Sequence, residues 1–516
     1  MTINPAIPPA PPSGQPAPGS AARPVRRVAI TNLGCKVNQA EMDALERLLR
    51  RRGIAVSADG RGTDLHVVNT CTVTGVADEK SRKAIRRARR ESPDGLVIAT
   101  GCAIRVGPDA FRSLDATALI VASETRDGLL AEVERLIGSG AAGDATGVPT
   151  AGVPTADKRG VATGSSMAET PGGPLDGPLP TLAGVEPAAA PVAQVRIGRA
   201  RAYLKVQDGC SFHCTYCIIP RARGPERSLP PDAVMEDAGQ ALAAGHRELV
   251  LTGINIGTYD GGRSEVGPRG ERRVTLSLAG LVRRLLADTP VERVRVSSIE
   301  PQHVDDDLLA TMAGSGGRCM PHLHLPLQSG DDGVLRRMGR RYDAAFYART
   351  VERVRTALPG AAIHADVIAG FPTEDDAAWA RTVALVRSLD LAGLHVFRYS
   401  ARPGTPATRM VGQVPEQVRR ARAAELLALA EAMRRDRVLR AVGDERLVLF
   451  EVPDGAGGWI GHCEDMVTVR VGAGAGAASL EGEIARVAID GPDPDDRARA
   501  IGHALALLPR PIFAGA

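Results

Sequence analysis

Aromatic residues are scarce in this 516-residue sequence and make up only 3% of it. Its hydrophobic cores must therefore rest on Leu, Val, Ile and Ala, which the 44% hydrophobic content supplies in quantity. At about 100–200 residues per domain, the length predicts roughly three domains. The net charge of +4 is small for this length, so charge alone does not imply a nucleic-acid partner.

Long apolar runs are also missing. No stretch approaches the roughly 20 residues that cross a bilayer, and the N-terminus lacks the basic start and apolar segment of a signal peptide. We therefore expect a cytoplasmic protein with no membrane partner. In that reducing compartment the eight cysteines are expected to bind metal or take part in catalysis rather than form disulfides.

Composition divides the chain into five segments. Residues 1–25 and 139–195 are rich in Pro, Ala and Gly, and we interpret them as a disordered tail and a low-complexity linker. Residues 26–138 and 196–432 alternate strand and helix patterns, which predicts two α/β domains with parallel sheets. Residues 438–510 are strand-like with Gly-rich turns, which predicts a small β-barrel.

The strand and helix patterns indicate the topology of each part. In the first domain, strands are predicted at 27–31, 65–69 and 96–100, with helices at 39–52 and 78–91. In the second, strands are predicted at 202–206, 248–252, 294–298, 322–327, 363–368 and 393–399, with helices at 232–244 and 276–287. Such a series suggests a full or partial α/β barrel, where ligands sit at the carboxyl ends of the strands. A long helix at 416–442 precedes strand-like segments at 446–451, 461–471 and 480–489.

Three closely spaced cysteines, Cys210, Cys214 and Cys217, follow the first strand of the predicted barrel in the segment DGCSFHCTYCIIPRARG. Thiolates suit iron–sulfur clusters, and three of them leave one iron of a [4Fe–4S] cube open to another ligand. A structural zinc site normally takes four protein ligands, and no suitable fourth ligand follows. A zinc knuckle or three unrelated buried thiols are the alternatives, but the spacing at a strand end favours the open cluster.

Three further cysteines, Cys35, Cys71 and Cys102, each lie shortly after a predicted strand of the first domain. The carboxyl ends of parallel strands share one edge of a sheet, so three loops can bring these thiols together. One buried cysteine alone means little, and coincidental packing is the alternative. Three in the same position predict a second three-cysteine cluster. Cys319 and Cys463 have no partner at ligand spacing, and we expect them to be buried or incidental thiols.

The CxxxCxxC run, with Tyr216 before its last cysteine, resembles the signature of the radical-SAM superfamily. The resemblance implies that S-adenosylmethionine chelates the open iron and that one electron cleaves it to a 5′-deoxyadenosyl radical. Candidate cofactor contacts are Tyr216, Thr252, Gly253, Asn255, Ser298 and Asp366. Glu300, in the segment SSIEP, is a further candidate for a catalytic role. A turn or a supporting role is the alternative for Glu300 and Asp366, and His322 and His324 either line the barrel or pack locally.

The order of the three parts, together with segments such as QDGCSFHCTYCIIPRARGPERS and ADVIAGFPTE, resembles the methylthiotransferase family. In that family a second cluster carries the sulfur that is inserted. One S-adenosylmethionine methylates this sulfur, and another supplies the radical that removes hydrogen from an unactivated carbon. The resemblance implies two [4Fe–4S] clusters on the six cysteines, S-adenosylmethionine, a sulfur donor, and an electron donor such as flavodoxin or ferredoxin.

The segments LGCKVNQAEMD and VNTCTVTGVADEKSRKAIRR resemble the family branch that acts on N6-threonylcarbamoyladenosine next to the anticodon of tRNA. The isopentenyladenosine branch usually has an Asn-rich segment after the first cysteine, and the ribosomal-protein branch a Pro–Lys–Asn stretch. Neither is present, although GCAIR departs from the aromatic residue and Gln that tRNA branches more often carry there. The same chemistry on those other substrates, or a non-catalytic iron–sulfur RNA-binding or sensor protein, are the alternatives.

Local basic clusters fit an RNA partner. Four basic residues recur at i, i+3, i+4 and i+7 of the helix predicted at 78–91, namely Lys83, Arg86, Arg87 and Arg90. Such a face can track phosphates, and a solvated surface is the alternative. We also expect Arg221, Arg223 and Arg227 to add positive charge near the barrel mouth. The terminal β-domain resembles the TRAM domain, a small RNA-binding barrel, and its few aromatic residues predict backbone contacts rather than base stacking.

Overall fold

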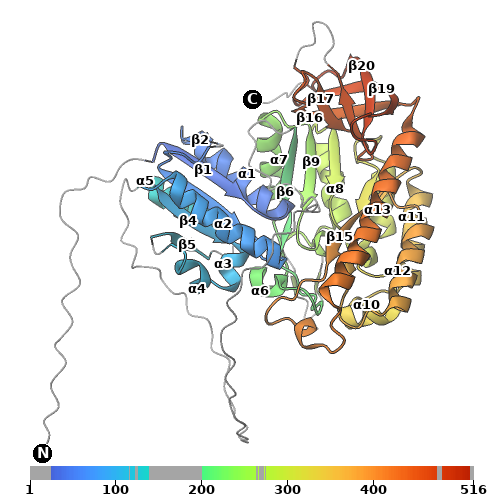
Figure 1. Cartoon of the computed structure of the whole chain (residues 1–516). Coiled ribbons are helices and arrows are strands. Elements are labelled where there is room, and N and C mark those ends of the chain that lie inside the picture. Colours follow the sequence, from blue (N-terminus) through green and yellow to red (C-terminus); the bar gives the residue numbers. More distant parts are fainter. Residues whose placement is uncertain are drawn as a thin grey trace, which may run out of the picture.

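The computed structural model describes residues 25–138, except 58, 116 and 123–125, and residues 200–511, except 263–264, 267–271, 274 and 473–478. The predicted linker lies outside the described residues, as does the predicted tail apart from Val25. Figure 1 shows an α/β domain, a central α/β barrel and a small β-barrel in chain order. Within the described part of the chain, no helix combines the length and apolarity needed to cross a bilayer.

The N-terminal domain is built on a five-stranded parallel sheet in the order β2-β1-β3-β4-β5. Its strands are β1 (Arg27–Asn32), β2 (Ala55–Ser57), β3 (Leu65–Thr70), β4 (Leu96–Gly101) and β5 (Leu119–Val121). Its helices are α1 (Lys36–Arg51), α2 (Gly75–Glu91), α3 (Cys102–Val106), α4 (Asp109–Arg112) and α5 (Arg126–Gly138). Helices α1 and α5 cover one face of the sheet and α2, α3 and α4 the other, which explains why β3 is buried along its whole length.

The central barrel is partial. Strands β6 (Arg201–Lys205), β9 (Glu248–Thr252) and β12 (Arg293–Val296) form one sheet in the order β12-β9-β6. Strands β13 (His322–His324), β14 (Ala362–Ala369) and β15 (Gly393–Arg398) form the other. Parallel bridges from Val294 to Cys319 and from Ser298 to His324 join the two sheets, and β6 and β15 remain as edges. Strand β13 ends earlier than predicted, and Pro326, which lacks a backbone donor, follows.

Helices cover the outer face of this barrel. They are α7 (Pro231–Ala243), α8 (Leu278–Asp288), α9 (Asp306–Ala313), α10 (Asp332–Met338), α11 (Ala344–Ala357) and α12 (Asp376–Ser388). Smaller elements in the loops are α6 (Ile219–Arg223), β7 (Gln207–Asp208), β8 (Arg227–Ser228), β10 (Glu265–Val266), β11 (Arg272–Arg273), η1 (Ile256–Thr258), η2 (Pro301–His303) and η3 (Pro406–Arg409).

The inner and outer faces of the barrel differ in polarity because side chains alternate along a strand. Outward residues such as Leu204, Leu323 and Ala365 join the apolar core under the helices. Their neighbours in the strands point the other way and are largely polar, among them Arg201, Lys205, Arg295, His322, His324, His364, Asp366 and His395. The inner face of this barrel is therefore largely polar, and we call the region that it surrounds the chamber.

One long helix, α13 (Glu416–Ala441), connects the barrel to the C-terminal domain. Its Leu426 packs in the central core and its Val438 in the terminal core. That domain is a closed barrel in the order β16-β17-β18-β20-β19. Its strands are β16 (Glu445–Pro453), β17 (Trp459–His462), β18 (Thr468–Val471), β19 (Ile484–Pro492) and β20 (Ala500–Leu507). The small β-barrel predicted from the sequence is confirmed.

Two details of the C-terminal domain differ from the prediction. Residues 461–471 are not one strand, because the chain turns between β17 and β18, where Met466 has a positive φ of 71° and the Cys463 N–H donates to the Val467 carbonyl. Strand β20 was not predicted. It closes the barrel by pairing with β18 and β19, yet most of its residues are exposed, so it lacks the apolar alternation that marks a half-buried strand.

Candidate active site

The loop that carries Cys210, Cys214 and Cys217 is held in place from several sides. The Cys210 N–H donates to the Gly224 carbonyl at 3.1 Å, and the Thr215 N–H donates to the Met338 carbonyl at 2.9 Å. The three thiols are half-buried and act on one another electrostatically. Burial raises the pKa of Cys210 to about 11 and that of Cys217 to about 12.

A glutamine joins this loop to the end of β9. The Gln207 amide donates to the Gly209 carbonyl at 2.8 Å, and its oxygen accepts from the backbone N–H groups of Ile254 at 3.0 Å and Asn255 at 2.8 Å. The side-chain amide of Asn255 is buried, yet neither its nitrogen nor its oxygen has a hydrogen-bond partner. Because an unpaired buried amide is costly, it points to a ligand beside the loop.

An arginine ties the cysteine loop to the other sheet of the barrel. The Arg340 guanidinium lies 3.5 Å from the Cys214 sulfur and 3.4 Å from the Tyr216 hydroxyl, and it forms an ion pair with Glu300. Burial raises the pKa of Glu300, although the charge of Arg340 opposes this. Glu300 therefore holds Arg340 against the loop rather than facing open solvent.

The other three cysteines lie at the carboxyl ends of adjacent strands. Cys35 follows β1 and is the N-cap of α1, Cys71 follows β3, and Cys102 follows β4 and begins α3. Burial, together with the charges of Cys35 and Cys102, raises the pKa of Cys71 to about 12. The predicted meeting of these residues at one sheet edge is what the strand order produces.

Glycines before Cys35 and Cys102 make this approach possible. Gly34 and Gly101 have positive φ angles of 119° and 96°, which favour glycine. A Cβ atom on Gly34 would lie 3.2 Å from the Cys71 sulfur, and one on Gly101 would lie 2.5 Å from the Thr70 carbonyl oxygen. A larger residue at either position would push the strand-end loops apart.

Neither cysteine group has its three sulfurs as close together as a single tetrahedral ion requires. Sulfur ligands of one tetrahedral zinc lie within about 4 Å of one another. Among the described His, Cys, Asp and Glu residues, only one group of three has its donor atoms all within 4.8 Å, and it contains no cysteine. A [4Fe–4S] cube spreads its ligands over several irons and so accepts the wider spacing.

A buried ionic network joins the two cysteine-bearing domains. Glu41, on α1, lies 2.7 Å from the Lys205 ammonium and 3.0 Å from the Arg223 guanidinium. Asp208 lies 2.6 Å and 3.0 Å from the same two groups. Although burial acts to raise it, the charges of Lys205 and Arg223 hold the pKa of Glu41 far below its usual value.

Arg223 reaches from this network into the N-terminal cysteine group. Its Nε lies 3.2 Å from the Cys102 sulfur and its Nη2 donates to the Asn38 side-chain oxygen at 2.5 Å. The expectation that Arg223 adds positive charge at an open mouth is therefore wrong, because acidic partners bury and neutralise it. A second contact, from Arg402 to Asp78 at 3.0 Å, fixes the start of α2 beside the barrel.

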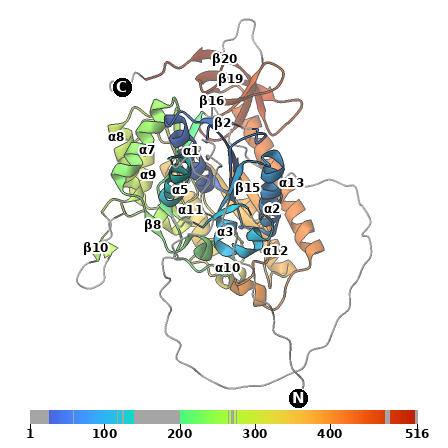
Figure 2. The same ribbon diagram turned by 90° about the vertical axis from the view of Figure 1, so that its left-hand side faces the viewer.

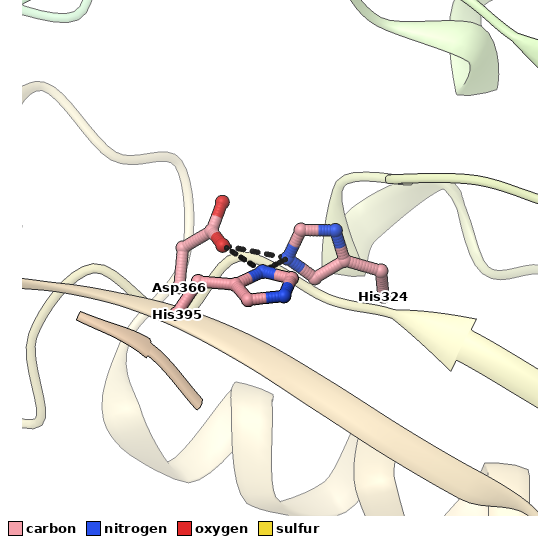
Figure 3. Close-up of side chains that lie close together, drawn as sticks. All are labelled: His324, Asp366 and His395. Atoms are coloured by element: carbon pink, nitrogen blue, oxygen red, sulfur yellow. Dashed lines mark hydrogen bonds and ion pairs between the residues drawn. The ribbon is translucent and has the colours of Figure 1, made fainter. Parts of the chain in front are cut away.

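Histidines and an aspartate cluster on the inner face of the barrel. Figure 3 shows His324, Asp366 and His395 together: the Asp366 carboxylate lies 2.7 Å from His324 Nε2 and 3.1 Å from His395 Nδ1. The other nitrogen of His324 lies 2.6 Å from the Ser298 hydroxyl. Both nitrogens of His324 thus have hydrogen-bond partners, and the group is a hydrogen-bonded cluster. Two residues predicted to contact the cofactor, Ser298 and Asp366, are bonded to His324 in it.

The remaining predicted residues lie as follows. Thr252 is buried at the end of β9, and the backbone of Gly253 is packed against Gln207. Lys83, Arg86, Arg87 and Arg90 form one exposed face of α2, where Glu79 and Glu91 pair with Lys83 and Arg87. Cys319 and Cys463 are buried in apolar cores, in agreement with expectation.

Sequence reasoning missed several residues around the chamber. Gln207, Arg340 and Arg223 carry no local pattern, because their partners lie far away in the chain. Phe397, on the inner side of edge strand β15, is 42% exposed, and Lys36 is half-buried where α1 meets the barrel. The scarcity of aromatic residues was the one available signal, and it applied only to Phe397.

Comparison with known proteins adds independent information. Residues 204–386 match the family model of the Radical SAM superfamily, and residues 27–122 match that of uncharacterized protein family UPF0004. The chain is 36% identical over 412 residues to the threonylcarbamoyladenosine tRNA methylthiotransferase MtaB of Bacillus subtilis, which covers 79% of this chain and 81% of the relative.

Two further relatives show the range of the similarity. The protein of the same name from Thermotoga maritima is 32% identical over 429 residues, covering 83% of this chain and 87% of the relative. A tRNA-2-methylthio-N(6)-dimethylallyladenosine synthase from Sorangium cellulosum is 32% identical over 500 residues, covering 93% and 92%.

The interdomain network leads to a stability prediction. Glu41→Gln should lower the free energy of unfolding by about 3–5 kcal/mol, because it leaves Lys205 and Arg223 buried with one carboxylate between them. The matched control is Glu46→Gln on the same helix, which breaks a more exposed pair with Arg50 and should cost less than about 1 kcal/mol. Chemical denaturation of both variants measures the difference, and equal losses would contradict a special role for the network.

Proposed function

This chain belongs to the radical-SAM methylthiotransferase family, and we propose that it inserts a methylthio group at C2 of N6-threonylcarbamoyladenosine in tRNA, next to the anticodon. The observation that carries the proposal is the 36% identity to the Bacillus subtilis threonylcarbamoyladenosine tRNA methylthiotransferase over most of both chains. The residues around Cys35 and Cys71 support the same branch. Dimethylallyladenosine in tRNA is the alternative, because relatives with that named activity match as well.

The radical-SAM assignment implies a [4Fe–4S] cluster and S-adenosylmethionine. When bound, they supply a carbon radical that removes hydrogen from an unactivated position. We assign Cys210, Cys214 and Cys217 as the cluster ligands. The unpaired amide of Asn255 supports a cofactor site beside them, for which Tyr216, Thr252 and Gly253 are also candidates. Ser298 and Asp366 contribute through His324, and Glu300 positions Arg340.

A second cluster on Cys35, Cys71 and Cys102 is part of the proposal. Its support is their shared sheet edge and the reach of Arg223 to Cys102. In its family this cluster provides the inserted sulfur. Arg223 donates toward the buried Cys102 sulfur, which favours the thiolate form that an iron ligand requires.

The partners follow from the reaction. Cleavage of S-adenosylmethionine takes one electron, so an electron donor such as flavodoxin or ferredoxin is required, and the inserted sulfur must be replaced by a sulfur donor.

The exposed basic face of α2 is proposed to contact tRNA phosphates, and Phe397 offers a ring for base stacking at the chamber edge. We infer a cytoplasmic location, because the proposed substrate is tRNA. We propose that the three domains comprise residues 26–138, 196–432 and 438–510.

The substrate is tested by nucleoside mass spectrometry of tRNA. A strain that lacks the gene should accumulate threonylcarbamoyladenosine and lose its 2-methylthio derivative, and the intact gene should restore it. Persistence of that derivative in a strain with no second such enzyme would show that the substrate assignment is wrong. Loss of the 2-methylthio form of dimethylallyladenosine instead would favour the alternative.

The two clusters are tested by iron content and by separated activities. Anaerobically purified protein should contain about eight irons per chain, and Cys71→Ala about four. Cys210→Ala should abolish cleavage of S-adenosylmethionine, whereas Cys71→Ala should leave cleavage intact and stop sulfur insertion. The matched control, Cys319→Ala, removes a buried core thiol and should keep all the iron. Equal loss of cleavage in Cys71→Ala and Cys210→Ala would contradict this division.

The basic face of α2 is tested by salt-dependent binding of tRNA. Arg86 and Arg90 are its two members without a carboxylate partner among the described residues. The double variant Arg86→Gln with Arg90→Gln should reduce the slope of log affinity against log salt by about 2. The control pair, Arg51→Gln with Arg434→Gln, removes two exposed arginines from α1 and α13. An unchanged slope in the α2 variant would assign this face to solvent.

A further inference from the structure

Lys36 projects from the N-terminal domain toward the barrel. It is the first residue of α1, directly after Cys35, and it shares a helix face with Ala40 and Ala44 at i+4 and i+8. Both alanines are buried, yet neither belongs to the apolar core of their own domain. They are covered instead because α1 packs on β6 and β9 of the barrel. Figure 1 shows α1 beside β6, and Figure 2 shows the N-terminal domain in front of the barrel.

The packing of α1 brings Lys36 to the inner face of the barrel, because Glu41 on the same helix lies 2.7 Å from Lys205, an inner-face residue of β6. Lys36 interacts electrostatically with Arg201 on β6, Arg295 on β12 and Asp366 on β14. It also acts on His322 and His364, on β13 and β14. All five residues alternate with outward residues of the apolar core and therefore belong to the inner face. These interactions agree with the packing of α1 on β6 and β9, which brings the helix against the inner face of the barrel.

This ammonium has no partner of its own. Within the described residues, no hydrogen bond or ion pair engages Lys36, whereas the other lysine at the interface, Lys205, pairs with Glu41 and Asp208. The neighbouring charges are already matched, since Arg201 pairs with Glu451 at 2.8 Å and Arg295 with Glu248 at 2.6 Å. Asp366 is held by His324 and His395.

A half-buried cation beside two arginines is costly unless an anion joins it. Lys36 therefore offers an unmatched positive charge to one negative group, directly after Cys35 in the chain and at the inner face of the barrel. The two candidate substrates differ in the charge of their N6 substituent. The threonylcarbamoyl group carries a free carboxylate, whereas the dimethylallyl group is an uncharged hydrocarbon.

We propose that Lys36 binds the carboxylate of the threonylcarbamoyl group and thereby selects this adenosine over those with uncharged N6 substituents. The assignment rests on the proposed function and deepens it. A charge-assisted hydrogen bond holds the acidic substrate. An uncharged substituent leaves the half-buried ammonium without a partner, and a site with an unsatisfied polar group rejects such an analogue.

The experiment compares two anticodon stem-loop RNAs. One carries threonylcarbamoyladenosine, and the other carries the same group with its carboxylate converted to a primary amide. The reconstituted holoenzyme is assayed for methylthio insertion into each. Wild-type enzyme should favour the acid by roughly ten- to a hundredfold in kcat/KM, mainly through KM. Lys36→Met should lose this preference, and Lys36→Arg should keep most of it.

Two controls separate substrate binding from damage to the neighbouring cluster site. Lys36→Met should retain the iron content of the wild type and its rate of S-adenosylmethionine cleavage. Arg51→Met removes an exposed cation from the other end of α1 and should keep the full preference for the acid.

Each other outcome overturns a distinct claim. If Lys36→Met loses activity equally on both RNAs, Lys36 supports the fold or the cluster and the assignment is wrong. If the wild type uses the acid and the amide equally well, the assignment is wrong while the proposed function stands. If the wild type ignores both RNAs and modifies one bearing dimethylallyladenosine, the proposed function fails and the assignment fails with it.

Discussion

The buried network of Glu41, Lys205, Asp208 and Arg223 is the interaction on which the arrangement of the two cysteine groups depends. The groups belong to domains that are separated in the sequence by residues 139–195, so the contact between the domains must set their geometry. Buried ion pairs contribute little net stability after desolvation, but they tolerate few alternative alignments. This network serves alignment most directly through Arg223, which touches both the acidic groups and Cys102.

A second constraint is shared by both domains. Each uses the carboxyl ends of parallel strands, where loops converge without any need for sequence proximity. In the N-terminal domain the adjacent order of β1, β3 and β4 brings together loops that are more than thirty residues apart. In the barrel the same rule places the cysteine loop beside the end of β9, and Gln207 joins them. Both cysteine groups therefore lie at the carboxyl ends of the strands of their domains.

These rules explain what the sequence could predict. Cysteines at strand ends and the alternation of strands with helices are local patterns, so the six proposed cluster ligands and the fold class were accessible. Arg223, 182 residues from Glu41, and Arg340, 126 residues from Cys214, were not, because their roles arise only from tertiary contacts. Strand β20 was not predicted for a different reason. It is held by hydrogen bonds that close the barrel, and because most of its residues are exposed, its sequence lacks the apolar alternation of a half-buried strand.

The position of Lys36 shows how cluster binding and substrate choice can be varied separately. Cys35 is the N-cap of α1, so the next residue is oriented by the helix and by the packing of Ala40 and Ala44 on the barrel, whatever its own side chain. Its backbone lies beside a proposed cluster ligand, and its side chain belongs to the helix face that packs on the barrel. A substitution there changes the charge presented to the substrate and leaves the thiols in place. If Lys36 selects the substrate as proposed, a substrate held by its N6 substituent is also held close to the proposed second cluster.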